Sequence, residues 1–507
     1  MMNASFPFVH ASCFVMVIFG ATGDLAVNKL FPALFSMYKR KLLPDKYYIV
    51  GFSRRELDDE QFRDFLREKH IIAKSAKKGF IDPYVGGQIA AKDEEELWRE
   101  FVSNIYYQQG IFHEPSGYEA LIKKLVGFDE EIGACITRIF YLATPPDNYL
   151  SILTFLDSSK LSEGCGQGSD KWTRIAIEKP FGRDLETAKM LDQKLSKIFS
   201  EKQVFRIDHY LGKETIQNML AFRFANSIFE PLWNSEYIDH VQITFAEQEG
   251  IKTRGRFFEG TGILRDVAQN HILQMMAAVA MEQPRSFTRE DVRDARAKAI
   301  KDIKCIEPTE VKYSVVRGQY ATYLSEQDVS PDSKTETFVA MKLMLENSRF
   351  AHVPFYIRAG KKMPQEMMEI SVVFKQTCHI LFKEYGCPEI GNVLTFRIQP
   401  DEGIKMRVIT KTPGMKLSLE TVDMKFNYKE HIEHKIVDAY EKILLDILSG
   451  DQMLFNRSDE LENSWQLITN ILRGWEDPSI PLYVYDDNTW GPREAMDLIE
   501  KDNRRWF

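Results

Sequence analysis

FVMVIFGATGDLA, residues 14–26, joins an apolar run to a glycine-containing turn. Val15–Phe19 is typical of a buried strand, and Lys29–Lys41 follows with the apolar spacing of a helix. A turn of this kind is where a Rossmann unit holds a dinucleotide, since glycine lets the backbone approach the pyrophosphate and the helix start offers unpaired N–H groups. The segment therefore predicts a dinucleotide site. Because its spacing is GxxGxxA and not GxGxxG, a purely structural turn competes with this interpretation.

The end of the next strand bears on the choice of dinucleotide. After the predicted strand Tyr47–Phe52 the chain reads Ser53-Arg54-Arg55, without the acidic residue that usually takes the ribose 2′-hydroxyl of NAD. Arg54 can pair with a 2′-phosphate through its planar guanidinium, and Thr22 can donate a hydroxyl. NADP is the predicted cofactor, with NAD as a weaker second one; a solvated surface arginine is the alternative.

Strand and helix signals along the chain predict two domains. The first, residues 1–214, alternates strands and helices and indicates an α/β Rossmann domain with a parallel sheet. Its further segments are the strands Phe140–Ala143 and Arg174–Ile177 and a helical stretch over Asp93–Tyr107. The second, residues 215–507, is predicted to be an α+β domain with a large, mainly antiparallel sheet. Its segments are the strands Tyr237–Phe245, Ser371–Phe374, Leu394–Gln399 and Met406–Thr410 and the helices His271–Met281 and Ile436–Leu448.

Composition excludes several function classes. The formal net charge of −8 and the lack of a basic cluster argue against a nucleic-acid partner. The six cysteines include no CxxC pair, so we expect no zinc site, no other metal and no disulfide framework. A cytoplasmic location is consistent with this cysteine usage. No apolar stretch reaches the roughly 20 residues that a membrane span needs.

Two segments concentrate reactive side chains. Arg206–Glu214, RIDHYLGKE, carries six ionisable or hydrogen-bonding side chains in nine positions, a density that a core segment does not tolerate. It is either an exposed helix start or a phosphate site. Arg265–His271, RDVAQNH, runs into an apolar helix. His271 is either a satisfied helix histidine or a base that takes a hydroxyl proton, with a carboxylate partner fixing its tautomer.

These segments resemble those of the glucose-6-phosphate dehydrogenase family, of the bacterial type. The shared blocks occur in family order over nearly the whole chain, and RIDHYLGKE is the most specific of them. The others are Gly20–Ala26 (GATGDLA), Glu178–Gly182 (EKPFG), Arg265–His271 (RDVAQNH), Arg358–Lys361 (RAGK), Arg397–Pro400 (RIQP), Arg457–Glu460 (RSDE) and Trp490–Pro492 (WGP).

The resemblance implies a reaction and a set of residue roles. The reaction is oxidation of glucose 6-phosphate to the 1,5-lactone with hydride transfer to NADP, the first step of the oxidative pentose phosphate pathway, in a homodimer or homotetramer assembled through the C-terminal sheet. His271 is the general base, oriented by Asp208, and Lys179 lies near substrate and cofactor. The implied substrate residues are His209, Tyr210, Lys213, Glu247, Asp266, Lys361 and Gln399. The implied cofactor residues are Gly20, Ala21, Thr22, Gly23, Asp24, Leu25, Lys29, Arg54, Tyr149 and Lys179.

The chain departs from the family pattern after Lys361. Where the family supplies a second basic residue four or five positions further on, this chain has Gln365 and Glu366. Phosphate affinity is then weaker, or Lys362 substitutes for the missing cation. Met367 and Ser371 replace two basic residues that hold a structural NADP in some members, so we expect no such site.

Three other functions compete with this one. A sugar oxidoreductase of the glucose-fructose oxidoreductase type shares an EKP segment but lacks RIDHYLGKE. A broader hexose-6-phosphate dehydrogenase of the luminal kind carries a signal peptide and a lactonase extension, neither of which is seen here. A non-catalytic NADPH-binding regulator on the same scaffold predicts loss of the base or of the phosphate ligands, yet His271, Asp208 and Lys213 are present.

Overall fold

The computed structural model describes residues 13–76, 91–164, 173–431 and 438–507. They form two compact units. Unit 1 comprises the described parts of Met1–Gly182, Glu186–Gly212 and His434–Ser458, and unit 2 those of Arg183–Leu185, Lys213–Glu433 and Asp459–Phe507. The sequence division after residue 214 did not anticipate that the chain returns to unit 1 after residue 433.

Unit 1 is built on a seven-stranded sheet with the strand order β15-β6-β5-β4-β1-β2-β3. The strands β1 to β6 are parallel, and the two-residue β15 pairs antiparallel with β6. This is the doubly wound order of a Rossmann fold, which confirms the predicted fold class. The strands are β1 (Phe14–Phe19), β2 (Tyr47–Ser53), β3 (Ile105–Gln109), β4 (Thr137–Leu142), β5 (Thr173–Ile177), β6 (Val204–Ile207) and β15 (Phe455–Asn456).

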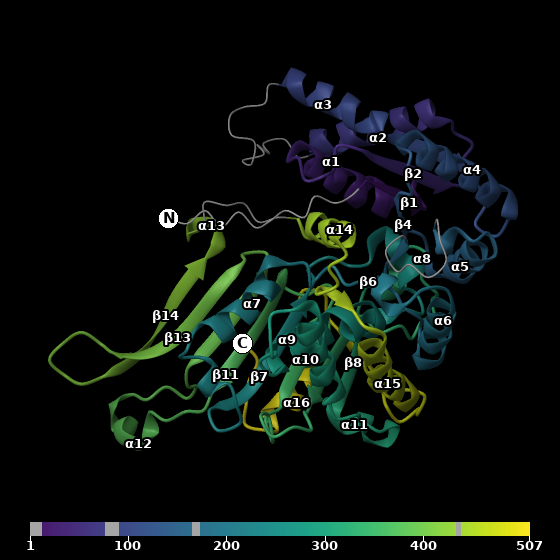
Figure 1. The fold of residues 1–507 in the computed structure, drawn as a ribbon. Helices are drawn as coiled ribbons and strands as arrows, with labels where there is room; N and C mark the ends of the chain where they lie inside the picture. The colour runs from purple at the N-terminus through teal and green to yellow at the C-terminus, as the bar shows by residue number, and fades with distance from the viewer. Residues whose placement is uncertain (1–12, 77–90, 165–172, 432–437) are drawn as a thin grey trace. The chain divides into compact units, whose positions relative to one another are not determined.

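Helices of unit 1 follow the strands as crossovers (Figure 1). They are α1 (Phe31–Lys39), α2 (Asp59–Ala76), α3 (Ala91–Ser103), α4 (Pro115–Ile132), α5 (Tyr149–Ser158) and α6 (Leu185–Ile198). A further helix of the unit, α14 (Ala439–Ser449), comes much later in the chain and connects no two of the parallel strands. The sequence prediction of a helix up to Tyr107 is wrong at its end, because Ile105–Tyr107 belongs to β3, which pairs with β2. The burial of β3 alternates along the strand, but this short strand directly follows the charged helix α3 in the chain, and the sequence prediction includes it in that helix.

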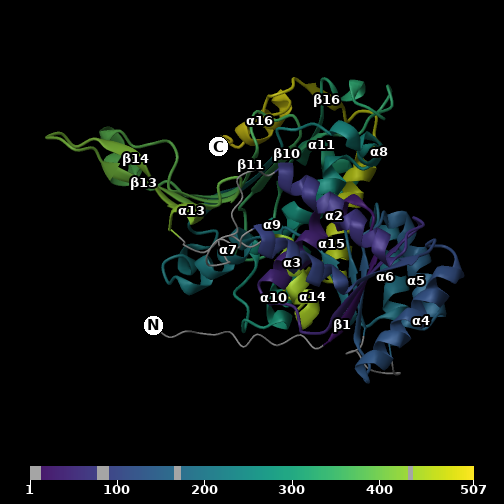
Figure 2. The same cartoon turned by 90° about the horizontal axis from the view of Figure 1, so that it is seen from above.

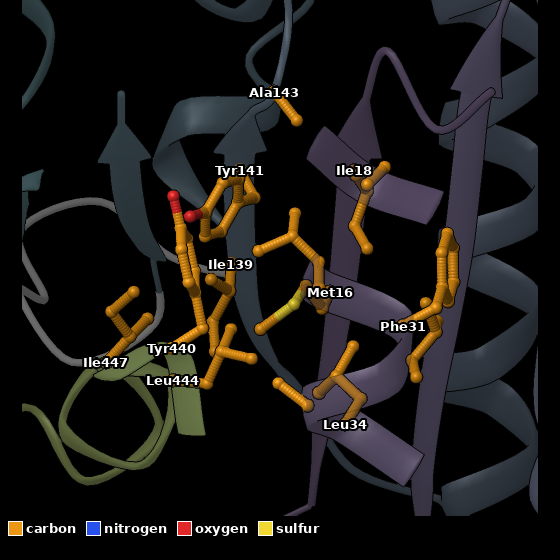
Figure 3. Close-up of a cluster of buried hydrophobic side chains, with 14 of the residues drawn as sticks. Met16, Ile18, Phe31, Leu34, Ile139, Tyr141, Ala143, Tyr440, Leu444 and Ile447 are labelled. Atoms are coloured by element: carbon orange, nitrogen blue, oxygen red, sulfur yellow. The ribbon is translucent and has the colours of Figure 1, made fainter. Parts of the chain in front are cut away.

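The core of unit 1 includes a helix from late in the chain. Tyr440, Leu444 and Ile447 of α14 lie against Ile139 and Tyr141 of β4, close to the β1 and α1 side chains of the same cluster (Figure 3). Arg174 of β5 donates to the main-chain oxygens of Ile447 and Leu448, both at 2.7 Å. The helix predicted over Ile436–Leu448 therefore exists over its described part and belongs to the core of the Rossmann unit.

Unit 2 contains a nine-stranded sheet with the order β14-β13-β12-β11-β7-β10-β9-β8-β16. All pairs are antiparallel except β7 with β10 and β8 with β16, which confirms the expected mainly antiparallel sheet. The strands are β7 (Ile238–Ala246), β8 (Val315–Tyr320), β9 (Phe338–Leu343), β10 (Phe355–Gly360), β11 (Met367–Phe374), β12 (Val393–Gln399), β13 (Gly403–Lys411), β14 (Leu419–Asn427) and β16 (Leu482–Tyr485).

Helices of unit 2 such as α7 cover part of this sheet, and the β13–β14 hairpin at its edge extends beyond the helices (Figures 1 and 2). Helix α7 packs on β12, and the π-helical segment η7 (Leu264–Ile272) lies on β10 and continues directly into α9. The helices are α7 (Glu214–Ala225), α8 (Gly255–Phe258), α9 (Leu273–Ala280), α10 (Arg289–Lys301), α11 (Val311–Ser314), α12 (His379–Phe382), α13 (Tyr428–His431), α15 (Ser458–Gly474) and α16 (Arg493–Glu500).

One expectation about the cysteines is wrong. Cys378 and Cys387 form a disulfide, and Cys135 is also disulfide-bonded. The segment between β11 and β12 brings the Cα atoms of Cys378 and Cys387 to within 5.9 Å of each other. Their separation of nine residues in the sequence does not by itself predict this proximity. Within the described residues, no helix is both long enough and apolar enough to cross a bilayer.

Candidate active site

The turn after β1 presents bare backbone. Gly20 has a φ of +88°, and a Cβ at this position would overlap the carbonyl of Ala143 at the end of β4. The Gly20 N–H donates to Phe52 O at 2.8 Å and the Gly23 N–H to Gly20 O at 2.9 Å, so the turn is tied to β2 and to itself. The helix begins directly afterwards at Asp24, so the predicted residues Gly20–Leu25 form a glycine turn that runs into a helix start.

Three predicted cofactor residues lie in or near this turn and differ in their contacts and exposure. The hydroxyls of Thr22 and Ser53 lie 2.8 Å apart, which joins the turn to the end of β2. Arg54, directly after β2, is exposed, and so is Lys29 on the helix that follows the turn. The planar guanidinium of Arg54 offers several N–H donors, and the segment Ser53–Arg55 contains no acidic residue.

The EKPFG segment follows β5 and contains a buried carboxyl. Glu178 is 7% exposed, and Tyr141 donates to its Oε1 at 2.7 Å. Burial raises the pKa of Glu178 to about 7, while Lys179 and the Tyr141 hydrogen bond act in the opposite direction. Tyr149, assigned to the cofactor by resemblance, is buried and donates to the main-chain oxygen of Glu178 at 2.9 Å. The phenol of Tyr149 thus fixes the backbone directly before Lys179.

Asp208, His209 and Tyr210 lie after β6 in the same unit. Asp208 is 2% exposed, and its Oδ1 accepts the backbone N–H of Tyr210 at 3.0 Å. The His209 ring lies 6.0 Å from the ring of Tyr440 on α14, nearly parallel to it. The polar residues of this segment therefore lie in a tight turn that packs against the Tyr440 ring.

Unit 2 joins four of the predicted substrate residues in two pairs. Lys213, at the N-terminal end of α7, donates through Nζ to Gln399 Oε1 at the end of β12. Lys361, directly after β10, is 1% exposed and pairs with the carboxylate of Glu247, directly after β7. Each pair thus joins a lysine ammonium to an oxygen acceptor from an element far away in the sequence, Lys213 at the start of α7 and Lys361 directly after β10.

Asp266 and His271 share the segment η7. His271 is 2% exposed, and its ring lies parallel to that of Phe245 at 6.4 Å. The Asn270 side chain accepts the His271 backbone N–H at 2.6 Å and donates to Asp266 O at 3.1 Å. The backbone carrying the histidine is thereby tied to the preceding helical turn.

Comparison with known proteins gives the family. Residues 17–218 match the model of the glucose-6-phosphate dehydrogenase NAD binding domain, and residues 220–507 match that of the C-terminal domain of the same enzyme. The chain belongs to the glucose-6-phosphate dehydrogenase family. It is 40% identical to a glucose-6-phosphate 1-dehydrogenase of Chlamydia pneumoniae, over 97% of this chain and 95% of the relative.

Solved structures of the family agree with the fold. A glucose-6-phosphate dehydrogenase in complex with glucose 6-phosphate superposes with a TM-score of 0.85 at 34% identity, covering 97% of this chain and 98% of the other. A glucose-6-phosphate 1-dehydrogenase from Mycobacterium avium gives 0.83 at 30% identity and covers 98% of both chains. Membership in this dehydrogenase family, as predicted from the motif blocks, is confirmed.

Sequence reasoning assigned no role to two buried acids of these units. Glu178 was quoted only as part of EKPFG, and Glu336, which contacts the start of η7, was not singled out. An acidic residue directly before an apolar strand, as in Glu336-Thr337-Phe338, was the available signal for Glu336. It does not distinguish a buried carboxyl from an exposed one.

Proposed function

We propose that this protein oxidises glucose 6-phosphate at C1 to the 6-phospho-1,5-lactone with NADP as hydride acceptor, the first step of the oxidative pentose phosphate pathway in the cytoplasm. The observation that carries the proposal is the pair of anchored lysines in unit 2, Lys213 with Gln399 and Lys361 with Glu247. In an acidic chain with a net charge of −8, these are local cations for an anionic sugar, each with an acceptor for a hydroxyl beside it.

The proposed roles in substrate binding and in the reaction fall on residues of both units. In unit 2, Lys213 binds the 6-phosphate, Glu247 and Asp266 accept hydrogen bonds from sugar hydroxyls, and Lys361 and Gln399 complete the set. In unit 1, His209 and Tyr210 add phosphate donors, and Asp208 and Lys179 serve the reaction as the family resemblance implies.

His271 acts as the general base. Neutral imidazole takes the C1 hydroxyl proton as the C–H bond breaks, a task for which histidine is the side chain used most often. Burial and the Phe245 ring hold the imidazole in one place, which reduces the cost of positioning.

The cradle after β1 fits NADP. Gly20, with its left-handed backbone, lets the turn pack closely against Ala143 directly before a helix start whose N–H groups suit a pyrophosphate, and the exposed Arg54 suits a 2′-phosphate. When bound, the nicotinamide supplies the hydride acceptor. Thr22 and Lys29 are the further donors of this unit, and Tyr149 fixes the backbone before Lys179.

The sheet of unit 2 supports a further proposal, assembly into a homodimer or homotetramer. The β13–β14 hairpin exposes Met415, Leu417, Val422 and Met424, an apolar set that a partner subunit would cover. Sedimentation velocity at micromolar concentration tests this proposal, which a monomer would contradict.

NADPH absorbance after mixing the protein with glucose 6-phosphate and NADP is the test, repeated with free glucose and with NAD. We expect product with the phosphorylated sugar and little with glucose. His271→Asn should lower kcat by about two orders of magnitude or more, with little change in substrate affinity. Lys213→Ala should instead raise KM for glucose 6-phosphate and leave NADP binding unchanged. A folded protein that binds NADP and is silent with every pair overturns the proposal.

A further inference from the structure

The segment η7 begins without a cap of its own. Ile263 precedes it and has no side-chain acceptor for the unpaired N–H groups at the helix start. Glu336, directly before β9, supplies two acceptors instead. Its Oε1 accepts the Leu264 N–H at 3.1 Å, and its main-chain oxygen accepts the Ile263 N–H at 2.9 Å. A carboxylate in this position also interacts favourably with the positive end of the helix.

Glu336 is closely enclosed at this place. It is 5% exposed, and a Cβ on Gly262, whose φ is +69°, would overlap the Glu336 carboxyl group. Burial raises the pKa of Glu336 to about 7, opposed by the Leu264 N–H and by the charges of Arg265 and Arg317. The carboxyl group therefore has a single place in this structure, and Gly262 is the residue that leaves room for it.

The residue after Glu336 contacts the second functional element of unit 2. The main-chain oxygen of Thr337 accepts the Lys361 N–H at 3.0 Å, and Lys361 pairs with Glu247 through its side chain. Tyr485 donates to Lys361 O at 2.7 Å and lies 3.1 Å from the Thr337 hydroxyl. Two consecutive residues thus hold the segment of Asp266 and His271 on one side and the lysine–glutamate pair on the other.

We propose that Glu336 is a positioning residue for the reaction: its carboxyl group fixes the start of η7 and, with Thr337, sets the placement of His271 relative to Lys361. The inference rests on the proposed function, which makes His271 the base and Lys361 a substrate residue. Misplacing a positioned group by about 1 Å costs up to roughly a hundredfold in rate, so loss of this contact should appear in kcat.

The experiment compares Glu336→Met with Glu336→Gln. Methionine keeps the length of the side chain and removes the acceptor, whereas glutamine keeps an oxygen for the Leu264 N–H. We expect E336M to lower kcat about ten- to a hundredfold, with KM for NADP nearly unchanged. Glucose 6-phosphate deuterated at C1 should show a larger isotope effect on kcat with E336M than with wild type, because proton and hydride transfer become rate-limiting. E336Q should stay within about threefold of wild type, since one acceptor is retained.

A pair of glycine variants tests the same contact without touching Glu336. Gly262 and Gly260 both have positive φ, +69° and +75°, so alanine strains both. Only at Gly262 would the new methyl group displace the Glu336 carboxyl group, because a Cβ on Gly260 has nothing within 4 Å. We expect G262A to reproduce the kinetics of E336M and G260A to leave kcat near that of wild type.

Several outcomes overturn the inference. Equal losses in E336M and E336Q, or a lower melting temperature with wild-type kcat and isotope effect, would show a purely structural residue. Glu369→Gln, which removes a partly buried carboxyl group from β11, controls for general destabilisation and should leave kcat unchanged. An inactive wild-type protein overturns the proposed function itself, whereas an active one with unaffected E336M overturns only this inference.

Discussion

At the scale of single residues, the proposed preference for NADP rests on Arg54. It is exposed at the end of β2, where an acid would favour NAD. A hydrogen bond to a charged group contributes about 1.5–3 kcal/mol, so Arg54→Ala should raise KM for NADP roughly ten- to a hundredfold and leave KM for NAD nearly unchanged. Initial rates with both cofactors measure this.

The neighbouring arginine is the matched control for that prediction. Arg55 is also exposed, and its guanidinium lies over the Phe65 ring at 5.2 Å. Arg55→Ala removes the same charge from the same loop and should leave the NADP-to-NAD ratio almost unchanged. Equal effects of the two variants would show a general electrostatic effect in place of a 2′-phosphate contact.

Glu366, at a position where the family resemblance implies a basic residue, contacts Gln399, one of the proposed substrate residues. Its Oε1 accepts from Gln399 Nε2 at 3.3 Å, and the other atom of that amide, Oε1, accepts from Lys213. Glu366 thereby orients the amide and adds negative charge next to Lys213, the lysine proposed to bind the 6-phosphate. Glu366→Gln should lower KM for glucose 6-phosphate several-fold and strengthen the competition by inorganic phosphate, while the competition by neutral sugars stays nearly unchanged. An unchanged KM would contradict the repulsion.

Individual site residues were predictable to different degrees. The glycines of the turn and Arg54 follow from backbone and charge arguments, and the pairing of Lys213 with Gln399 or Lys361 with Glu247 does not. Those partners are 186 and 114 residues apart in the sequence, so only the folded sheet brings them together. Likewise, the buried state of Glu178 depends on Tyr141 and on burial, neither of which is visible in EKPFG alone.

At the scale of elements, α14 shows the limit of periodicity. The apolar spacing of Tyr440, Leu444 and Ile447 predicts a helix with one buried face, and the structure has one. Periodicity does not say which core receives that face. Here the face packs on β4 and α1 in the Rossmann unit, more than 200 residues after the last strand of its parallel sheet (Figure 3).

Truncating this face tests the assignment of α14. Leu444 is fully buried in the core cluster, so Leu444→Ala should lower the free energy of unfolding by about 2–5 kcal/mol. Leu445→Ala, on the same helix but only partly buried, should cost clearly less. Hydrogen exchange locates the effect: amides of β1 and β4 should lose protection in L444A and those of β9 and β10 should not. Loss of protection confined to unit 2 would contradict the packing seen here.

At the scale of the whole molecule, the buried acids set the pH dependence of stability. Burial raises the pKa of Glu178 and Glu336 to about 7 and that of Asp446 to about 6. Each binds its proton more tightly in the folded chain than in the unfolded one, so its contribution is complete below the unfolded pKa and declines as pH rises through the folded value. His240, whose pKa burial lowers, acts in the opposite direction below its ordinary value. Among the described residues named here, three carboxyl groups have a raised pKa and one histidine has a lowered pKa. The free energy of unfolding should therefore fall between pH 5 and pH 8.

Glu178→Gln isolates one of these contributions. The pKa of Glu178 rises from 4.5 to about 7, and at 1.36 kcal/mol per unit this contributes about 3 kcal/mol in total, most of which is lost between pH 5 and pH 8. Glutamine keeps the acceptor for Tyr141 and has no proton to lose, so unfolding of unit 1 should depend on pH less steeply by about that amount. Urea unfolding at both pH values, followed by exchange of β4 and β5 amides, measures the difference. Glu282→Gln removes a carboxyl group whose pKa Arg349 lowers, and its effect should be confined to acid pH. An unchanged slope in E178Q would mean that Glu178 is ionised in the folded protein throughout this range, with Lys179 outweighing its burial.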